Sequence, residues 1–250
     1  MLVEEYREVN RISLTELKRI WKTIRNDVLL IGGWAAHFLS NDRFRSWKRI
    51  DYIGSKDIDL GIKSRDVGIV TKKLEELGYT PINFRFYKIF DRITKKPIKE
   101  EIAKKLPIFN IFYLYLDVIL DEDVKTKTVF FSDPLIKFCF ENETWIKISG
   151  FKVIRPEPLV LTKLRILDKR DEEKRIKDIL DCIFVLNFSD FDNNFFKEIS
   201  NIYKINKSNK EMALTILNSP QLEMELSSLR FDGSEIQNVK TTFMSIFDFK

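Results

Sequence analysis

Apolar positions near the start of the chain recur at helical spacing. Ser13 and Glu16 form a capping-box pattern, in which two side chains satisfy the free N–H groups at a helix start. The apolar residues that follow would share one helix face, and they are Leu14, Leu17, Ile20, Trp21 and Ile24. We therefore predict a first helix from Ser13 to about Arg25.

A short apolar run, Val28–Ile31, ends in the pair Gly32-Gly33, and a helical pattern resumes over Trp34–Leu39. An apolar run that stops at glycines indicates a buried strand running into a tight turn. The stretch 41–56 is polar and irregular, and we predict no element there.

Strand-like and helical patterns alternate up to residue 155. The segment 57–62 predicts a strand, and Ser64 would cap a helix that ends at Gly78. Further strands are predicted in three segments, 83–90, 111–120 and 126–154. The lysine-rich segment 94–105 interrupts them and indicates an exposed insertion.

After Arg155 the pattern becomes helical. Helical periodicity covers 159–167 and 171–186, and the remainder lacks strand signals. We therefore predict an α+β fold, in which a mixed sheet flanked by helices is followed by a C-terminal helical domain. The expected domains are 1–155 and 156–250.

Composition and charge narrow the class of protein. Of the 250 residues, 44% are hydrophobic and 32% are charged, which is ordinary for a globular protein. The net charge of +5 suits an anionic partner, although a solvated lysine-rich surface explains it equally well. The distant Cys139 and Cys182 lack metal-ligand spacing, and the acidic, polar start is not a signal peptide. We expect a cytoplasmic protein without membrane segments.

Carboxylates and glycines carry the candidate chemistry. Backbone N–H groups at a glycine turn that opens a helix can hold phosphate, as Gly32 and Gly33 would. Asp57 and Asp59 are two apart on a predicted strand, so their carboxylates share one face. Two like charges side by side favour a cation between them, although an acidic strand edge in solvent is the simpler interpretation.

Asp117 strengthens the case for a metal site. It lies within the apolar strand 111–120, where a carboxylate is costly to bury unless it is paired, hydrogen-bonded or metal-bound. Asp121 and Asp123 share its strand face and are the alternatives. Together with Asp57 and Asp59, Asp117 could hold two Mg²⁺ ions for in-line phosphoryl displacement.

These motifs resemble a known family. The pattern Ile31-Gly-Gly-Trp-Ala, Asp57-Ile-Asp-Leu and Leu116-Asp-Val is similar to the DNA polymerase beta-like nucleotidyltransferase superfamily, over about residues 28–187. Within it the chain resembles AbiEii/AbiGii-type toxins of toxin–antitoxin and phage-defence systems. The Gly-Gly-Trp-Ala form is also similar to aminoglycoside nucleotidyltransferases. The gap before Asp57 is longer than usual, and no serine follows the glycines.

The resemblance implies roles for these residues. Asp57, Asp59 and Asp117 would be the catalytic residues and the ligands of Mg²⁺ or Mn²⁺. Gly32 and Gly33 on the turn would bind the nucleotide. In the helical half, AbiEii-like proteins carry basic and acidic residues beside the cleft, and the residues at the matching positions would also bind the nucleotide: Lys163, Arg170, Asp178 and Asp181. The alternative for the last two is a solvated helix, on which Lys174–Asp178 and Lys177–Asp181 are ordinary (i, i+4) pairs.

The sequence thus predicts an enzyme that transfers a nucleotide from an NTP, such as ATP, to an acceptor hydroxyl. The net charge favours tRNA, another RNA or a protein as the acceptor, and a toxin with a cognate antitoxin is one form of this hypothesis. Two alternatives stay open: a transferase acting on an aminoglycoside-like small molecule, and a non-catalytic nucleotide- or RNA-binding module of the same fold.

Overall fold

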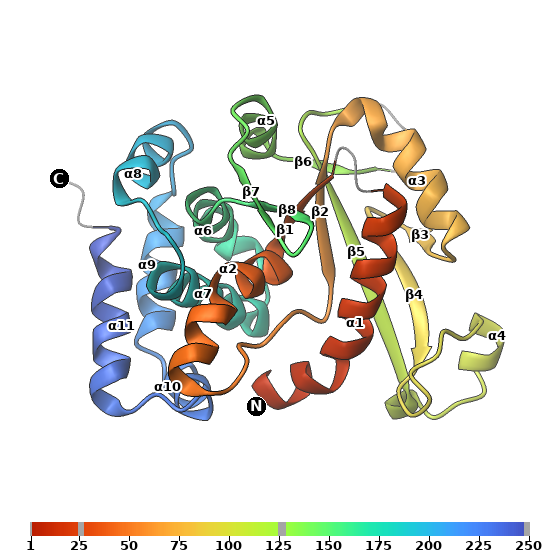
Figure 1. The fold of residues 1–250 in the computed structure, drawn as a ribbon, viewed down its shortest axis with the longest axis horizontal. Coiled ribbons are helices and arrows are strands. Elements are labelled where there is room, and N and C mark those ends of the chain that lie inside the picture. Colours follow the sequence, from red (N-terminus) through yellow and green to blue (C-terminus); the bar gives the residue numbers. More distant parts are fainter. Residues whose placement is uncertain (1, 25–27, 125–128, 248–250) are drawn as a thin grey trace.

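A mixed sheet forms the centre of the computed structural model, which describes residues 2–24, 28–124 and 129–247 (Figure 1). The order of its strands in the described residues is β3-β4-β5-β2-β1-β8-β7, and β6 pairs with β5. The strands are β1 (Val28–Ile31), β2 (Ile58–Ile62), β3 (Thr80–Ile82), β4 (Arg85–Asp91), β5 (Ile111–Leu120), β6 (Phe131–Ser132), β7 (Trp145–Ile148) and β8 (Phe151–Ile154).

The three central strands bring the glycine turn beside the carboxylates. β2 runs antiparallel to β1, with Ile31 opposite Asp59, and parallel to β5, with Asp59 opposite Asp117. β1 is buried along its whole length, as are Ile58 and Leu60 of β2. Because one face of β2 is held in the core, Asp59 is directed to the opposite face.

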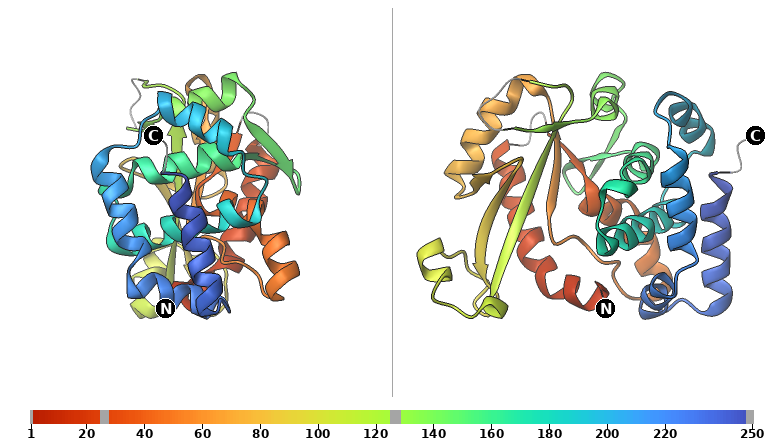
Figure 2. Two further views of the ribbon diagram at one scale, coloured as in Figure 1. Left: turned by 90° about the vertical axis from the view of Figure 1, so that its left-hand side faces the viewer. Right: turned by 180° about the vertical axis from the view of Figure 1, so that it is seen from behind.

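Helices flank the sheet and make up the C-terminal part of the chain. They are α1 (Leu2–Ile24), α2 (Gly32–Lys48), α3 (Val67–Glu76), α4 (Glu100–Ala103), α5 (Pro134–Glu141), α6 (Pro156–Arg165), α7 (Glu172–Phe188), α8 (Asn193–Ile202), α9 (Lys207–Leu217), α10 (Pro220–Ser228) and α11 (Gly233–Ser245). α1 and α3 lie beside β4 and β5, whereas α6 to α11 gather with α2 on the other side of the molecule (Figures 1 and 2).

The α+β architecture and its helical ending agree with the sequence prediction. The strand over 111–120, the strand–glycine–helix unit and the helices after residue 155 are all present. The last strand ends at Ile154 and a helix begins at Pro156. The division into domains 1–155 and 156–250 remains a prediction. In the described part of the chain, no helix has the length and apolarity needed to cross a bilayer.

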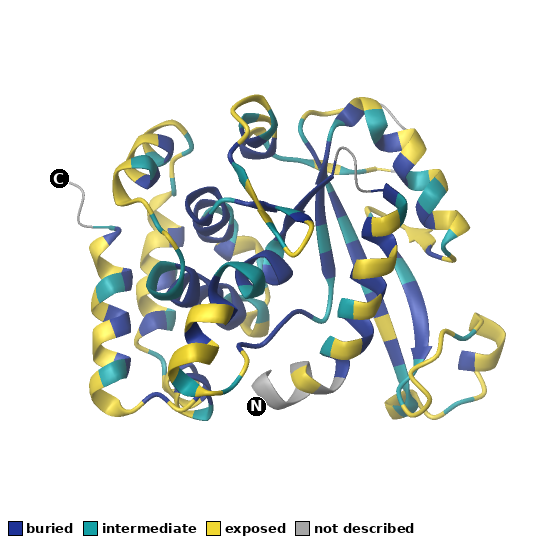
Figure 3. Cartoon of the chain, viewed as in Figure 1, coloured by how far each residue is buried: buried dark blue, intermediate teal, exposed yellow. Residues whose placement is uncertain are grey.

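Two predicted helix starts are wrong. The first helix begins at Leu2 rather than Ser13, because Val9 and Ile12 already bury apolar side chains. Figure 3 shows buried and exposed positions alternating along α1. The buried Ser13 hydroxyl accepts a hydrogen bond from the Trp34 indole at 2.8 Å instead of capping the helix, whose expected last residue, Arg25, lies outside the described residues. Ser64 lies in a 3-10 turn before α3 and does not cap it.

Two further predictions, that 41–56 contains no helix or strand and that 126–154 contains strands alone, are also wrong. α2 continues through the polar stretch to Lys48, because Phe44 is fully buried there and contacts Phe184 edge-on at 4.8 Å between ring centroids. The segment 126–154 contains a helix, α5, besides its strands; Asp133 caps it by accepting the Leu135 N–H, and Pro134 opens it. Residues 125–128 lie outside the described residues.

Candidate active site

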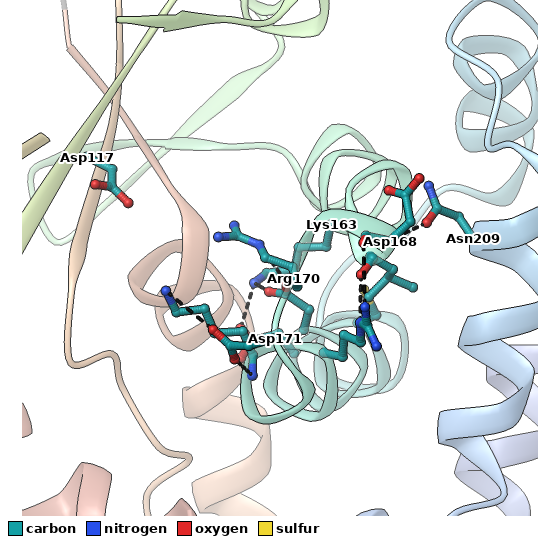
Figure 4. A network of polar contacts seen from close by, with 12 residues as sticks. Asp117, Lys163, Asp168, Arg170, Asp171 and Asn209 are labelled. Carbon is teal, nitrogen blue, oxygen red and sulfur yellow. Dashed lines mark hydrogen bonds and ion pairs between the residues drawn. The ribbon is translucent and has the colours of Figure 1, made fainter. Parts of the chain in front are cut away.

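One pocket contains every residue that the sequence predicts for the site. Its lining combines the glycine turn, three carboxylates at the sheet and basic and acidic side chains of the helical half: Gly32, Gly33, Ser55, Asp57, Asp59, Asp117, Lys163, Arg170, Lys174, Lys177, Asp178 and Asp181. In Figure 4, Asp117 lies on the strand side of this region, across from Lys163 and Arg170. The alternatives Asp121 and Asp123 do not line the pocket; they accept hydrogen bonds from Ser64 and Ser132.

The two glycines permit close contacts that other residues would block. Gly32 has a left-handed backbone (φ +65°), and a Cβ there would lie 2.0 Å from Oδ2 of Asp59. A Cβ on Gly33 would lie 2.8 Å from the Ser55 hydroxyl. The carboxylate of Asp59 therefore rests directly against the turn.

Helix α2 begins at this turn without a side-chain cap in the described residues. The first N–H groups of a helix have no partner within the helix and attract anions. The start of α2 is thus suited to hold a phosphate group beside Asp59.

Burial and mutual repulsion disfavour the charges of the carboxylates. Burial, together with the neighbouring charges of Asp117 and Asp57, raises the pKa of Asp59 to about 7. Burial also raises the pKa of Asp57, against the opposing effect of Arg85. Oxygen ligands crowded in this way fit a hard divalent cation such as Mg²⁺.

The fit to a metal ion is incomplete in the arrangement seen here. Within the described ranges, no group of three acidic, histidine or cysteine side chains is placed to hold an ion. At Asp117 both carboxylate oxygens already accept hydrogen bonds from Arg85 of β4, whose Nε and Nη2 donate to Oδ1 and Oδ2, each at 2.7 Å. The donor atoms fit Mg²⁺ or Mn²⁺, but Asp117 would have to exchange its partner.

The helical wall of the pocket is a buried ion network. Lys163 Nζ of α6 lies 2.5 Å from Asp178 Oδ1 and 2.8 Å from Asp181 Oδ2, both on α7. Lys177 also pairs with Asp181, and the Tyr52 hydroxyl donates to the same carboxylate at 2.5 Å. Burial alone would lower the pKa of the Lys163 ammonium, but the charges of Asp178 and Asp181 outweigh it and raise that pKa. In the same way, Lys163 and Lys177 outweigh the effect of burial on Asp181 and lower its pKa.

The alternative of a solvated α7 face does not hold for these residues. Lys177, Asp178 and Asp181 are all buried, because α6 packs against this face and supplies Lys163. Lys174 lies 4.0 Å from Asp171 rather than pairing with Asp178. Arg170 Nε lies 3.4 Å from Asp178 Oδ2, and one third of its side chain is exposed.

Several residues of the site escaped the sequence reasoning. Ser55 and Lys177 stand within the motifs that led to Asp57 and Asp178, and that proximity was the available signal. Arg85 and Tyr52 gave none, because their contacts depend on strand pairing and on packing against α7.

The pH dependence of stability tests the environment of Asp59. Without metal, folded Asp59 keeps its proton up to about pH 7, whereas in the unfolded chain it ionises near pH 4. The folded state is therefore favoured at low pH, and this contribution is lost as the pH rises from about 4 to about 7. Between pH 5 and 8 we expect the free energy of unfolding to fall by roughly 2–3 kcal/mol more in the wild type than in Asp59→Asn.

Urea unfolding of both proteins in EDTA provides the measurement. The comparison at each pH removes the contribution of titrating groups that lie away from position 59, because the two proteins differ at that position alone. Parallel pH profiles would mean that Asp59 is already ionised in the folded protein at pH 5.

Comparison with known proteins finds a weak structural likeness. No family model and no curated protein matches the sequence. Among solved structures, the chain is similar to the solution structure of the antibiotic-resistance factor ANT(2'')-Ia, with 12% sequence identity, a TM-score of 0.34, and coverage of 81% of this chain and 96% of that chain. Likeness at this level carries no conclusion about activity.

Proposed function

We propose that this protein is a metal-dependent nucleotidyltransferase that transfers a nucleoside monophosphate from an NTP, such as ATP, to an acceptor hydroxyl. The observation that carries the proposal is the pocket itself. It combines a glycine turn at an uncapped helix start, three crowded carboxylates and basic side chains on the facing wall. Phosphoryl transfer needs this combination, because its transition state is stabilised mainly by positioning and charge neutralisation.

Each part of the pocket has a role in this proposal. Asp57, Asp59 and Asp117 would hold Mg²⁺ or Mn²⁺, which when bound neutralises the phosphates and activates the attacking hydroxyl. The N–H groups of the glycine turn would bind phosphate oxygens. Arg170 and Lys174, the more exposed cations of the lining, would contact the triphosphate, while Lys163 keeps Asp178 and Asp181 in place.

An anionic acceptor is the favoured substrate, with RNA ahead of protein. The insertion 94–105 contains five exposed lysines and lies where β4 ends and β5 begins (Figure 1). Between it and Asp117, Tyr113 stacks against Tyr115 with ring centroids 6.3 Å apart, and Tyr113 is 39% exposed. Lysines attract phosphates and exposed aromatic rings stack with bases. An aminoglycoside, being a polycation, fits this surface less well.

Transfer of label from an NTP tests the proposal. The purified protein would be incubated with each α-labelled NTP, Mg²⁺ and one of three acceptor pools: total RNA, cell protein or aminoglycosides. We expect metal-dependent labelling of RNA or protein. Labelling of aminoglycosides alone would reassign the acceptor, and labelling of none would contradict the proposed activity. A toxin role further predicts growth arrest on expression and relief by a cognate antitoxin.

A non-catalytic nucleotide- or RNA-binding module is the second candidate. The ion pair between Arg85 and Asp117 favours it, because a carboxylate held by an arginine needs no metal. Titration calorimetry with each NTP, with and without Mg²⁺, separates the two candidates. Equal NTP binding in the absence of the metal would support the module.

A further inference from the structure

Arg85 is placed where it neutralises a carboxylate of the pocket. It lies on β4 directly opposite Asp117 on β5. Its guanidinium makes a two-pronged contact with both carboxylate oxygens, at 2.7 Å each, and Nη2 also lies 3.9 Å from Oδ2 of Asp57. Fork-shaped pairs of this kind are among the strong charge-assisted hydrogen bonds.

The surroundings hold Arg85 in this position. The side chains of Arg85 and Asp117 are 19% and 20% exposed, so solvent screens the pair less than it screens a surface pair. Cζ of Arg85 lies 4.4 Å from the centroid of the Tyr115 ring, in a cation–π contact. The contact follows from the β4–β5 register, which sets Asp117 opposite Arg85 and Tyr115 opposite Tyr87.

The carboxylates are unequally compensated as a result. Asp117 is paired with the guanidinium of Arg85, and Asp57 lies 3.9 Å from the same group. Asp59 forms no ion pair within the described part of the chain. A divalent ion shared by the three carboxylates would bind the same oxygens of Asp117 that Arg85 contacts, and would place its positive charge beside the guanidinium. Ion and guanidinium therefore compete for the same atoms.

We propose that Arg85 is an internal counter-ion that competes with the divalent ion for Asp117, so that the metal site assembles only when Arg85 leaves that carboxylate. This inference rests on the proposed metal-dependent function and adds a control on its metal site. The Tyr115 ring offers the displaced guanidinium a contact that does not involve Asp117. Arg85 would thus lower the affinity for the ion without preventing its binding.

The affinity for Mn²⁺ alone tests the competition without any measurement of activity. Free Mn²⁺ would be followed by electron paramagnetic resonance in titrations of the wild type, Arg85→Gln and Arg85→Lys. Since a hydrogen-bonded charge pair must otherwise be broken, Arg85→Gln is expected to bind Mn²⁺ roughly tenfold or more tightly than the wild type. Arg85→Lys keeps the charge but loses the fork, and should fall between them.

Lys174→Gln is the matched control for loss of a positive charge. Lys174 lines the same pocket and acts on Asp57 through space, and it forms an ion pair with Asp171 at 4.0 Å. Its replacement should tighten Mn²⁺ binding less than about threefold, because only long-range attraction is removed. An equal gain in both variants would mean that general charge, and not the contact with Asp117, sets the affinity, and would overturn the proposal.

A second measurement uses the unaltered protein, in case Arg85→Gln does not fold. The Arg85 Nε–H signal, assigned by its absence in Arg85→Lys, should be protected from exchange in EDTA and lose protection on addition of Mg²⁺. Persistent protection at saturating Mg²⁺, or unchanged or weaker Mn²⁺ binding by folded Arg85→Gln, overturns the inference alone. Absence of Mn²⁺ binding in both folded proteins would instead contradict the metal-dependent function.

Discussion

An Asp57→Asn/Asp59→Asn variant is expected to lose at least about 1000-fold in nucleotidyl transfer, because a catalytic metal contributes several kcal/mol to the transition state. Both carboxylates line the pocket, and Asn offers the same shape without the charge that holds a cation. The rate of α-labelled NMP transfer at saturating Mg²⁺ is the measurement. Undiminished transfer would remove these residues from the catalytic site.

The same variant should remain folded, which separates loss of chemistry from loss of structure. Burial and, after it, repulsion already disfavour the charge of Asp59, so an amide there costs little stability without metal. Asp190→Asn is the control, since that side chain is 91% exposed and pairs with Arg43 away from the pocket. Its transfer rate should equal that of the wild type.

Replacement of Lys163 by Met is expected to destabilise the protein by about 3–5 kcal/mol, the usual cost of removing one partner from a buried ion pair. Lys163 is 6% exposed and contacts both Asp178 and Asp181. Lys177 continues to neutralise Asp181 in the variant, whereas the remaining ion-pair partner of Asp178 among the described residues is Arg170, at 3.4 Å. Urea unfolding at pH 7.5 measures the loss.

A second variant identifies the cause of that loss. In Lys163→Met/Asp178→Asn the carboxylate charge that has lost Lys163 is gone as well, so much of the stability should return. A loss below about 1 kcal/mol, the value typical of surface pairs, would show that the network is solvated after all.

The sequence determined the local parts of this protein. An apolar run ended by glycines predicted the strand Val28–Ile31 and the turn at Gly32, and a second apolar stretch predicted β5 within its observed bounds. Such patterns are readable because the spacing of side chains along a helix or strand is a property of the backbone itself. The order of the glycines and of Asp57, Asp59 and Asp117 pointed to phosphate chemistry for the same reason.

Tertiary structure decided which charges meet. Arg85 faces Asp117 only because β4 and β5 pair in one register, and Lys163 neutralises Asp178 only because α6 packs against α7. The same packing turned a stretch of α7 that reads as a solvated surface into a buried ion network. Charged contacts between distant segments depend on the free energy of the whole packed arrangement, which no local spacing records.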